Sequence, residues 1–467
     1  MSNEKAHDRR TETDSLGNVE VPAAALYGAQ THRASENFPV SGLRIPRRVI
    51  RALALVKKAA AEVNRDTGKL PPKLADAIIA AAHEVAAGQH DGEFVVDIFQ
   101  TGSGTSSNMN TNEVIANRAI QILGGQVGSK KPVHPNDHVN MGQSSNDVFP
   151  TAVHIAATEA MERDLIPALE ALEGALGSKA QSFDHIVKIG RTHLMDAVPI
   201  RLGQEFAGYT QMLTNTIRRV RTAADSASEL ALGGTAVGTG LGSQPDFAPK
   251  VIAIISREIG IRLRQAPNLC EALAARDGLV EASGALRSAA VSLTKIANDV
   301  RWLGSGPRCG IGEILLPDLQ PGSSIMPGKV NPVMSEMLLM ICAQVVGNDA
   351  TIAWGGAAGN FELNVMIPVM AYNLLHSIAI LGNGCRLFAS KCIEGLEPNE
   401  ERCKALIEQS LAMVTALNPR IGYDAAAAIA KESVKTGKTV RELCLEKKVL
   451  PPDELARLLD ARSMTGR

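Results

Sequence analysis

The feature that most constrains this fold is a heptad repeat in the second half of the chain. Apolar residues recur at every seventh position and again three positions after each, as is typical of a helix that packs along other helices. The two sets are Leu279, Leu286, Leu293 and Val300, then Ala282, Ala289, Ile296 and Leu303. This seam predicts a helix over about 271–303, which would be roughly 50 Å long.

Four further alanine-rich segments are long enough to pack beside it, at about 151–183, 204–231, 332–353 and 363–393. Each is bounded by Gly, Pro or Asn, which commonly end helices. Apolar residues make up 45% of the chain but aromatic residues only 3%, so alanine and aliphatic side chains, which favour helix, must build the core. We therefore expect a mainly α-helical protein with a central bundle of long helices. Alanine in the seam permits close helix approach, which suits a bundle shared between subunits.

We expect three domains along the chain. Residues 1–143 mix short helical patterns with turn-rich stretches, and two proline-bearing stretches, ending at Pro150, separate them from the next part of the chain. Residues 144–395 hold the long helical segments. Residues 396–467 contain shorter and more charged segments, which indicate a small helical domain.

Charge and cysteine usage limit the partners. The 467 residues carry a formal net charge of -1 with no basic stripe, which argues against nucleic acid or an anionic membrane as partner. The seven cysteines are scattered and never spaced as CxxC, which is usual for thiols in a reducing compartment. No stretch approaches the roughly 18 uninterrupted apolar residues of a membrane span, and the first residues lack a signal-peptide core. We expect a soluble, cytoplasmic protein.

The stretch PGSSIMPGKVNP, residues 321–332, could hold an anion. It ends in Gly-Lys like a nucleotide-binding loop, but five residues instead of four separate its glycines, and Val330 stands where such a loop needs a hydroxyl. What remains is a loop with two hydroxyls and one cation, before a helix that Asn331 would cap and Pro332 would begin. Amides at a helix start bind a carboxylate as readily as a phosphate, so an organic acid is a candidate ligand.

Four other segments between helical patterns are rich in small polar residues: TGSGTSSNMNTNE (101–113), HPNDHVNMGQSSND (134–147), GRTHLMDAVP (190–199) and GGTAVGTGLGS (234–243). Any one alone is more often a cap or a turn, since Ser, Thr, Asn and Gly serve those roles routinely. Together with the loop they indicate a site where helix ends converge. His134 and His138 are four apart, but Pro135 argues against a continuous helix and no cysteine or acid completes a ligand set, so no metal is expected.

Two titratable residues in these regions suit acid–base chemistry. His193 on its own would more often be a hydrogen-bonded structural histidine, yet histidine is the side chain that titrates nearest neutrality. Glu336 lies about one turn into the helix after the loop, where a carboxylate commonly faces solvent or complements the helix dipole. If Glu336 instead meets a histidine, it would orient the ring and raise its basicity.

In this order, the segments resemble the fumarase/aspartase superfamily of lyases. GSSIMPGKVNP is similar to the superfamily's signature loop, and the resemblance runs from about Tyr27 to the last helices. The details resemble the metal-independent class II fumarases, because the loop reads Pro-Gly-Lys where aspartases typically carry Pro-Ala-Lys, and His193 stands where they typically have glutamine. RWLGSGPRCGIGEI and GGAAGNFELNV are likewise close to fumarases. Met141 and Gly142 depart from the Lys-Ser of many relatives.

The resemblance implies a homotetramer whose central helices form one bundle of twenty, with each active site drawing segments from three subunits. It implies anti hydration of fumarate to (S)-malate in the tricarboxylic acid cycle, through a carbanion (aci-carboxylate) intermediate and without cofactor or metal. Ser323 and His193 would be catalytic, with Glu336 paired to His193. Residues that would bind the dicarboxylate are Ser103, Gly104, Thr105, Ser144, Ser145, Asn146, Thr192, Ser324, Lys329, Val330 and Asn331. Residues that would form an accessory anion site are His134, Pro135, Asn136 and Asp137.

Two other interpretations stay open on the sequence. Another lyase of the superfamily, with aspartase the nearest, would have to tolerate His193 and accommodate an ammonium group, and activity on aspartate would decide. A helical scaffold without catalysis would be expected to lose Ser323, His193, Lys329 or Glu336, and all four are present.

Overall fold

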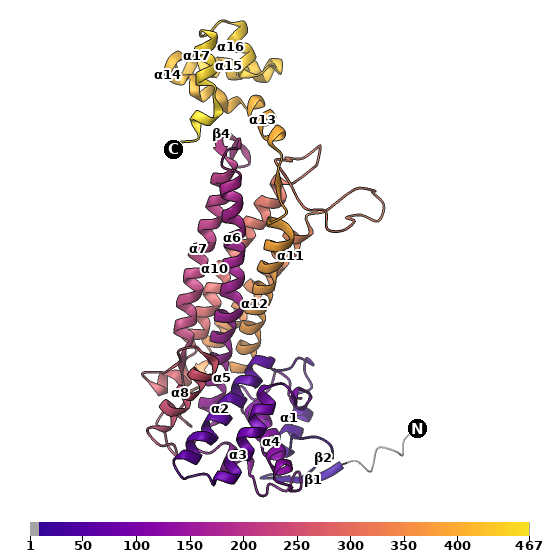
Figure 1. The fold of residues 1–467 in the computed structure, drawn as a ribbon, viewed down its shortest axis with the longest axis vertical. Helices are drawn as coiled ribbons and strands as arrows, with labels where there is room; N and C mark the ends of the chain where they lie inside the picture. Colours follow the sequence, from indigo (N-terminus) through magenta and orange to yellow (C-terminus); the bar gives the residue numbers. More distant parts are fainter. Residues whose placement is uncertain (1–8, 467) are drawn as a thin grey trace. The chain divides into compact units, whose positions relative to one another are not determined.

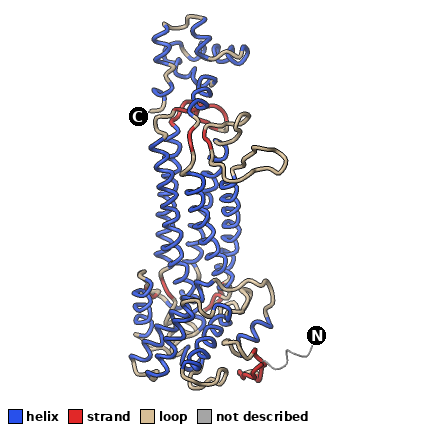
Figure 2. Tube along the Cα trace, turned by 45° about the vertical axis from the view of Figure 1, so that its right-hand side comes forward, coloured by secondary structure: helices blue, strands red, loops and turns tan. Residues whose placement is uncertain are grey.

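The computed structural model describes residues 9–466, which form two compact units, each made from several stretches of chain. Unit 1 takes in the chain up to Ile166, then Arg218–Ser288 and Ala343–Leu381; unit 2 takes in Pro167–Ile217, Ala289–Cys342 and the chain from Gly382 onward. The described residues hold seventeen α-helices and ten short strands, which pair only two at a time (Figure 2). The predicted mainly α-helical fold is confirmed.

Unit 1 packs short helices around α2 (Arg47–Asp66), whose apolar stripe is buried against α3, α5 and α8. The alanines of α2 permit this close packing, because they bring little side-chain volume between the helix axes. The other regular elements are β1 (Arg9–Asp14), β2 (Gly17–Pro22), α1 (Ala29–Asn37), α3 (Pro72–Ala86), α4 (Thr105–Ile122), α5 (Ser145–Ala160), β5 (Glu229–Leu230), α8 (Phe247–Ile259), β6 (Arg264–Gln265), α9 (Leu269–Ala274), β8 (Gly359–Asn360) and β9 (Leu363–Asn364).

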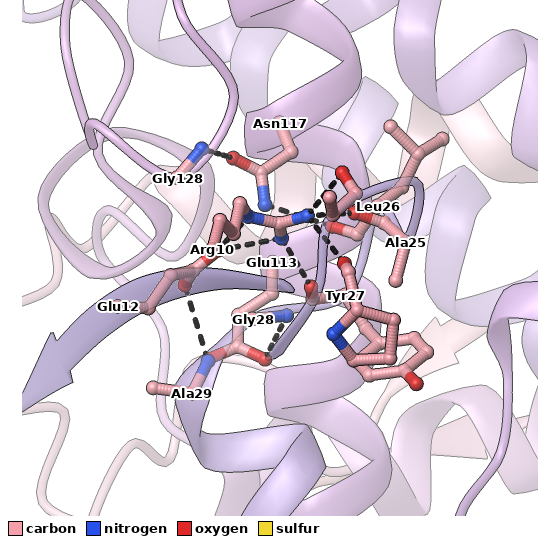
Figure 3. A network of polar contacts seen from close by, with 12 residues as sticks. Arg10, Glu12, Ala25, Leu26, Tyr27, Gly28, Ala29, Glu113, Asn117 and Gly128 are labelled. Carbon is pink, nitrogen blue, oxygen red and sulfur yellow. Dashed lines mark hydrogen bonds and ion pairs between the residues drawn. The ribbon is translucent and has the colours of Figure 1, made fainter. Parts of the chain in front are cut away.

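A polar network fastens the start of the described chain to α4 (Figure 3). Glu113, the last residue of the polar segment 101–113, is buried on α4 and accepts hydrogen bonds from the N–H groups of Gly28, Gln30 and Thr31, at 2.9, 3.0 and 3.1 Å. It thereby caps the N-terminus of α1, where N–H groups have no partner within the helix. Arg10 donates to four main-chain carbonyls between residues 22 and 27. Glu113 therefore has a structural role, although it belongs to a polar segment that was predicted to contribute to a site.

Unit 2 contains α6 from Pro167 onward and segments of α7, α10, α11 and α12, and Figure 1 shows the axes of these helices running in roughly the same direction. It also contains a hairpin of two strands and a group of short helices near the C-terminus. Its elements are α6 (Ile166–Ser182), β3 (Val187–Thr192), β4 (Met195–Arg201), β7 (Ile314–Leu315), β10 (Glu397–Pro398), α13 (Glu400–Gln409), α14 (Asn418–Ile421), α15 (Tyr423–Thr436), α16 (Val440–Glu446) and α17 (Pro452–Leu458).

Four long helices contribute segments to both units: α7 (Leu202–Ala227), α10 (Asp277–Leu303), α11 (Val333–Gly356) and α12 (Ile367–Phe388). All eight seam residues lie on α10, and each is at most 5% exposed. The heptad pattern therefore correctly predicted the buried face. The predicted length was wrong, because the chain is extended at Ala275 and separates α9 from α10, which leaves α10 with 27 residues and a length of about 40 Å.

Two predicted helix boundaries near prolines were also wrong. Pro150 does not separate the first part of the chain from the helices, because it lies inside α5. A capping box of Ser144 and Asp147 starts this helix, and burial of the turn that holds Pro150 offsets the hydrogen bond that proline cannot donate. In α11 the first helical residue is Val333, so Pro332 precedes the helix instead of beginning it.

Among the described residues, α11 is the one helix long and apolar enough, by length and composition, to span a membrane. A core helix of a soluble protein passes the same test, so this is weak evidence. In the single chain, only 33% of the most apolar 18-residue stretch of α11 is buried.

Candidate active site

The predicted site residues fall into two groups, one in each unit. Unit 1 holds Ser103, Gly104, Thr105, His134, Pro135, Asn136, Asp137, Ser144, Ser145 and Asn146. Unit 2 holds Thr192, His193, Ser323, Ser324, Lys329, Val330, Asn331 and Glu336.

In unit 1 the starts of α4 and α5 meet through hydroxyl groups. Thr105 Oγ1 lies 2.9 Å from Ser103 Oγ and 2.8 Å from Ser145 Oγ. Thr105 and Ser145 are the first residues of their helices, and unpaired N–H groups at helix starts favour anions. Asn146 is held nearby, since its Nδ2 donates to the carbonyl of Ala236 at 2.9 Å. Three of the predicted polar segments, 101–113, 134–147 and 234–243, therefore converge. They hold four of the predicted dicarboxylate ligands: Ser103, Thr105, Ser145 and Asn146.

Gly104 is required at this junction for two reasons. It precedes α4 with a φ of +79°, in the left-handed region that favours glycine. A Cβ atom on it would also lie 2.1 Å from the ring of Phe149, which is fully buried on α5. The glycine lets the start of α4 approach α5 closely enough for the two hydroxyls to meet.

The residues of the predicted accessory anion site form a tight local turn. Pro135–Val139 make a single π-helical turn, and His134 caps it, with Nδ1 accepting from the N–H groups of Asn136 and Asp137, both at 3.2 Å. His138 Nδ1 in turn accepts from the N–H of His134 at 2.9 Å. One ring nitrogen of each histidine is therefore used by the backbone.

In unit 2 the loop 321–332 is closed by its own polar groups. Asn331 Nδ2 donates to the carbonyl of Gly322, and Asn331 Oδ1 accepts from Lys329 Nζ, both at 2.8 Å. Ser323 Oγ accepts hydrogen bonds from the N–H groups of Ile325 and Met326, at 3.3 and 3.0 Å. Asn331 was expected to cap the next helix, and its side chain is instead used to hold the two ends of the loop together.

His193 lies at the tip of the β3–β4 hairpin, in a strained turn. Thr192 pairs with Met195, so the connection has only two residues, and both have positive φ: +56° at His193 and +61° at Leu194. Such a turn normally carries Asn-Gly or Gly-Gly, because side chains other than Gly and Asn are strained there. Strained backbone of this kind is often found at functional sites, where it serves to present a side chain.

A buried cluster of charged residues lies along β3, from Lys188 near the open end of the hairpin to Arg191 beside its tip. Glu313 has no exposed surface, and Arg191 donates to both of its oxygens, at 2.9 and 3.0 Å. Lys188 Nζ, almost fully buried, lies 3.2 Å from Glu313 and 3.2 Å from Glu205. Sequence reasoning missed this cluster, because 122 residues separate Arg191 from its partner.

Glu336 is exposed in the first turns of α11, and His193 is also exposed. Within the described residues of one chain, no hydrogen bond or ion pair joins them. Their predicted pairing stays a prediction.

Lys57 is a second residue that sequence reasoning missed. It lies on α2, has no exposed surface, and donates from Nζ to Asn108 Oδ1 at 2.8 Å, Asn140 Oδ1 at 2.8 Å and Gln143 Oε1 at 2.9 Å. Burial lowers its pKa to about 7, and the nearby carboxylate of Asp147 opposes this shift. The signal was present in the sequence: Lys57 falls four positions after Leu53, on the buried stripe of an amphipathic helix.

Comparison with known proteins places this geometry in a family. A family model described as "Lyase" matches residues 17–347, and one described as "Fumarase C C-terminus" matches residues 413–466. "Fumarate hydratase class II" of Mycobacterium tuberculosis (strain ATCC 25618 / H37Rv) is 58% identical over 97% of this chain and 96% of its own. The chain belongs to the class II fumarate hydratase family.

Other members of the class II fumarate hydratase family are similar over almost their whole length. The protein of that name from Ralstonia nicotianae is 53% identical over 98% of this chain and 99% of its own. The crystal structure of class II fumarase from Schistosoma mansoni superimposes with a TM-score of 0.94 at 40% identity, over 98% of this chain and 99% of that chain. The predicted family is confirmed.

Proposed function

We propose that this protein is a fumarate hydratase that reversibly adds water to fumarate to give (S)-malate, as in the tricarboxylic acid cycle. The observation that carries the proposal is the 58% identity over 97% of the chain to a class II fumarate hydratase. The retained Ser323, His193, Lys329 and Glu336 support it. The reaction is proposed to need neither metal nor cofactor.

The chemistry requires a site that stabilises a developing negative charge. In the direction from malate, a proton leaves a carbon next to a carboxylate, and the resulting carbanion spreads its charge onto that carboxylate. Fixed hydrogen-bond donors and cations that already point to this position lower the barrier. The hydroxyls of Ser103, Thr105 and Ser145 at two helix starts fit such a role. With Gly104, Ser144 and Asn146 they form the proposed unit 1 part of the dicarboxylate site.

The loop 321–332 is proposed to supply both a cation and the group that exchanges the carbon-bound proton. Lys329, Ser324, Val330 and Asn331 would bind the carboxylate, and Ser323 would take the proton. The two N–H groups that donate to Ser323 Oγ favour its ionised form, because hydrogen bonds to an anion stabilise it. The glycines of the loop would allow it to close over the substrate.

On the opposite face of the double bond, His193 is proposed to handle the water molecule, with Thr192 beside it binding substrate. Glu336 would accept a hydrogen bond from the imidazole, which orients the ring and raises its basicity. Because His193 and Glu336 do not contact one another in the described part of one chain, the pairing is proposed to form between copies. Each active site would then draw residues from three subunits of a homotetramer.

Exposed apolar side chains support the homotetramer. In unit 2, Val291 and Trp302 of α10 and Met340 of α11 are 62%, 51% and 68% exposed in a single chain. Exposed apolar residues along long helices are typical of faces that other helices cover. The proposal is that α10 and α11 pack against their copies in a shared bundle.

The accessory anion site at His134, Pro135, Asn136 and Asp137 and a cytoplasmic location are parts of the same proposal. Because Nδ1 of His134 accepts hydrogen bonds from the backbone, an anion would bind at the opposite edge of the imidazole ring. All seven cysteines are free, in keeping with a reducing compartment.

An ultraviolet assay tests the proposed function. The purified protein is incubated with malate and, separately, with aspartate, both with a strong chelator present. Appearance of the conjugated double bond from malate alone is the expected result. Its appearance from aspartate alone would identify an ammonia-lyase. No absorbance change with either substrate, from folded protein, would contradict catalysis on both.

Two variants test the assigned roles. Ser323→Ala and His193→Asn are each expected to lower kcat by about 10²–10⁴-fold, the range for losing an acid–base group. Asparagine is chosen because it tolerates positive φ, so the hairpin should be retained. Full activity of Ser323→Ala would refute the role of the serine.

A further inference from the structure

The amine of Lys57 lies in the interior of unit 1, with no exposed surface. Its three acceptors are all amide oxygens, and their orientation is fixed by the surrounding backbone. Gln143 Nε2 donates to the carbonyls of Val139 and Met141, both at 3.2 Å, and Asn140 Nδ2 donates to the carbonyl of Gln143 at 3.1 Å. The oxygens of both side chains must therefore face Lys57.

Three acceptors match the three donors of an ammonium group, whereas a neutral amine has only two N–H bonds. The environment also contains a compensating charge, because Asp147 is fully buried and its carboxylate favours the ammonium form of Lys57. Asp147 in turn accepts from the N–H groups of Ser144, Gly233 and Thr235, at 2.9, 3.0 and 3.0 Å. A charged Lys57 thus supplies one donor to each of its three amide oxygens.

This cluster joins the two segments that carry the unit 1 hydroxyls. Asn108 lies in the first turn of α4, three residues after Thr105, while Gln143 immediately precedes Ser144, the N-cap of α5. Asn140 also accepts from Asn108 Nδ2 and Asn112 Nδ2, at 3.3 and 3.2 Å. Lys57 therefore connects α4 to the approach to α5, and the contact between Thr105 and Ser145 connects the same two elements at their first residues.

We propose that Lys57 is a positioning residue for the dicarboxylate site: its buried ammonium group fixes the start of α4 relative to the start of α5, and so the spacing of the substrate-binding hydroxyls. The proposal rests on the proposed function, since it takes those hydroxyls as substrate ligands. Lys57 acts through Asn108, Asn140 and Gln143, and the proton-transfer residues Ser323 and His193 are not part of its cluster.

The decisive measurement is the separate effect on KM and kcat of Lys57→Met, which keeps the side chain's length and removes its charge and donors. Loosened ligands bind malate less tightly, so KM for malate should rise on the order of tenfold; kcat should fall as well to the extent that the same hydroxyls stabilise the charge that develops in the transition state. Lys58→Met is the matched control: Lys58 is the next residue on α2 and pairs with Glu258 of α8 instead. Its KM should match the wild type.

A purely structural lysine would give a different result. It would lower the thermal midpoint and the fraction of active protein, and hence the apparent kcat, while KM stayed unchanged; that outcome would overturn the proposal. An equal rise of KM in Lys58→Met would overturn it too. Wild-type protein inactive on malate would instead refute the proposed function, so the two failures are distinguishable.

Gln143→Met tests the same link if Lys57→Met does not fold. It removes one acceptor at a partly exposed position and should raise KM in the same direction. Where both variants fold, the double variant should raise KM by less than the product of the two single effects, because both disrupt one connection. Independent effects that multiply, or an unchanged KM in folded Gln143→Met, would contradict the proposed role.

Discussion

Glu84 on α3 lies between two basic groups of unit 1. Its Oε1 accepts from Arg118 Nη2 at 2.9 Å, and its Oε2 lies 2.9 Å from His90 Nε2. These partners, Arg118 above all, hold the pKa of Glu84 at about 2. Because the folded pKa lies below the usual value near 4.5, this pair stabilises the protein fully above that value, and the contribution is lost as the pH falls through 2.

We therefore expect Glu84→Gln to be less stable than wild type at pH 6, and the difference to shrink steadily between pH 4.5 and 2, since there the wild-type group gains its proton. Thermal midpoints of both proteins across this range would check it. A difference that stayed constant down to pH 2 would show that the charge of Glu84 does not contribute.

The sequence allowed residue-level prediction only where chemistry was local. The small polar segments include Thr105 and Ser145, which the structure brings into contact, although the resemblance alone gave these two residues a role as ligands. Buried charges were harder, because their partners lie far apart in sequence: Lys57 meets Asn140 across 83 positions, and Arg191 meets Glu313 across 122. A lone lysine on an apolar stripe can be recognised, but its partners cannot be identified without the fold.

At the scale of elements, the β3–β4 hairpin combines a strained turn at its tip with buried charges along β3. We expect Leu194→Gly to stabilise the protein by on the order of 1 kcal/mol, because glycine adopts the left-handed region without the clash that leucine suffers. Thermal unfolding would check this. Met195→Gly, an exposed neighbour within the strand, should destabilise instead, and equal effects of the two would contradict the explanation.

For the buried charges along β3 we expect a larger effect, of opposite sign. Glu313→Gln leaves Lys188 and Arg191 without their shared carboxylate in a buried place, so we expect a loss of about 3–5 kcal/mol in unfolding free energy. Denaturant unfolding would measure it. Glu205→Gln, which removes a partly exposed carboxylate from Lys188 alone, should cost clearly less, and an equal cost would mean that burial is not decisive.

Element prediction succeeded where a periodic pattern was long and failed at helix ends. The seam identified the buried face of α10 because eight positions agreed. The seam did not show the break at Ala275, because an extended residue in the backbone leaves no mark on the spacing of apolar residues in the sequence. The boundary predicted at Pro150 was wrong because proline usually ends a helix. Here a capping box and tight packing outweigh the missing N–H group.

At the scale of the whole molecule, the exposed apolar side chains of the long helices are the proposed contacts between subunits. We expect Val291→Glu, which puts a charge on the exposed face of α10, to convert the proposed tetramer into smaller species. Light scattering after size-exclusion chromatography would measure this. Leu16→Glu makes the same chemical change at an exposed apolar residue between β1 and β2, and it should leave the molar mass unchanged.

A monomeric wild type with full activity would contradict the proposal that subunits share each active site. The mainly helical architecture could be predicted from composition and periodicity, because both are properties of the sequence of a single chain. The number of subunits entered only through resemblance, and the three-domain division stays a prediction beside the two units that the structure forms.

The paired left-handed residues at the hairpin tip bear on how this protein would evolve in the laboratory. His193 and Leu194 have almost the same backbone geometry, so a library selected for heat resistance alone should replace both with glycine or asparagine. A library selected for heat resistance and growth dependent on the enzyme should replace only Leu194. The difference in replacement between these two equally strained neighbours would then show how strongly activity requires the histidine, without a purified enzyme.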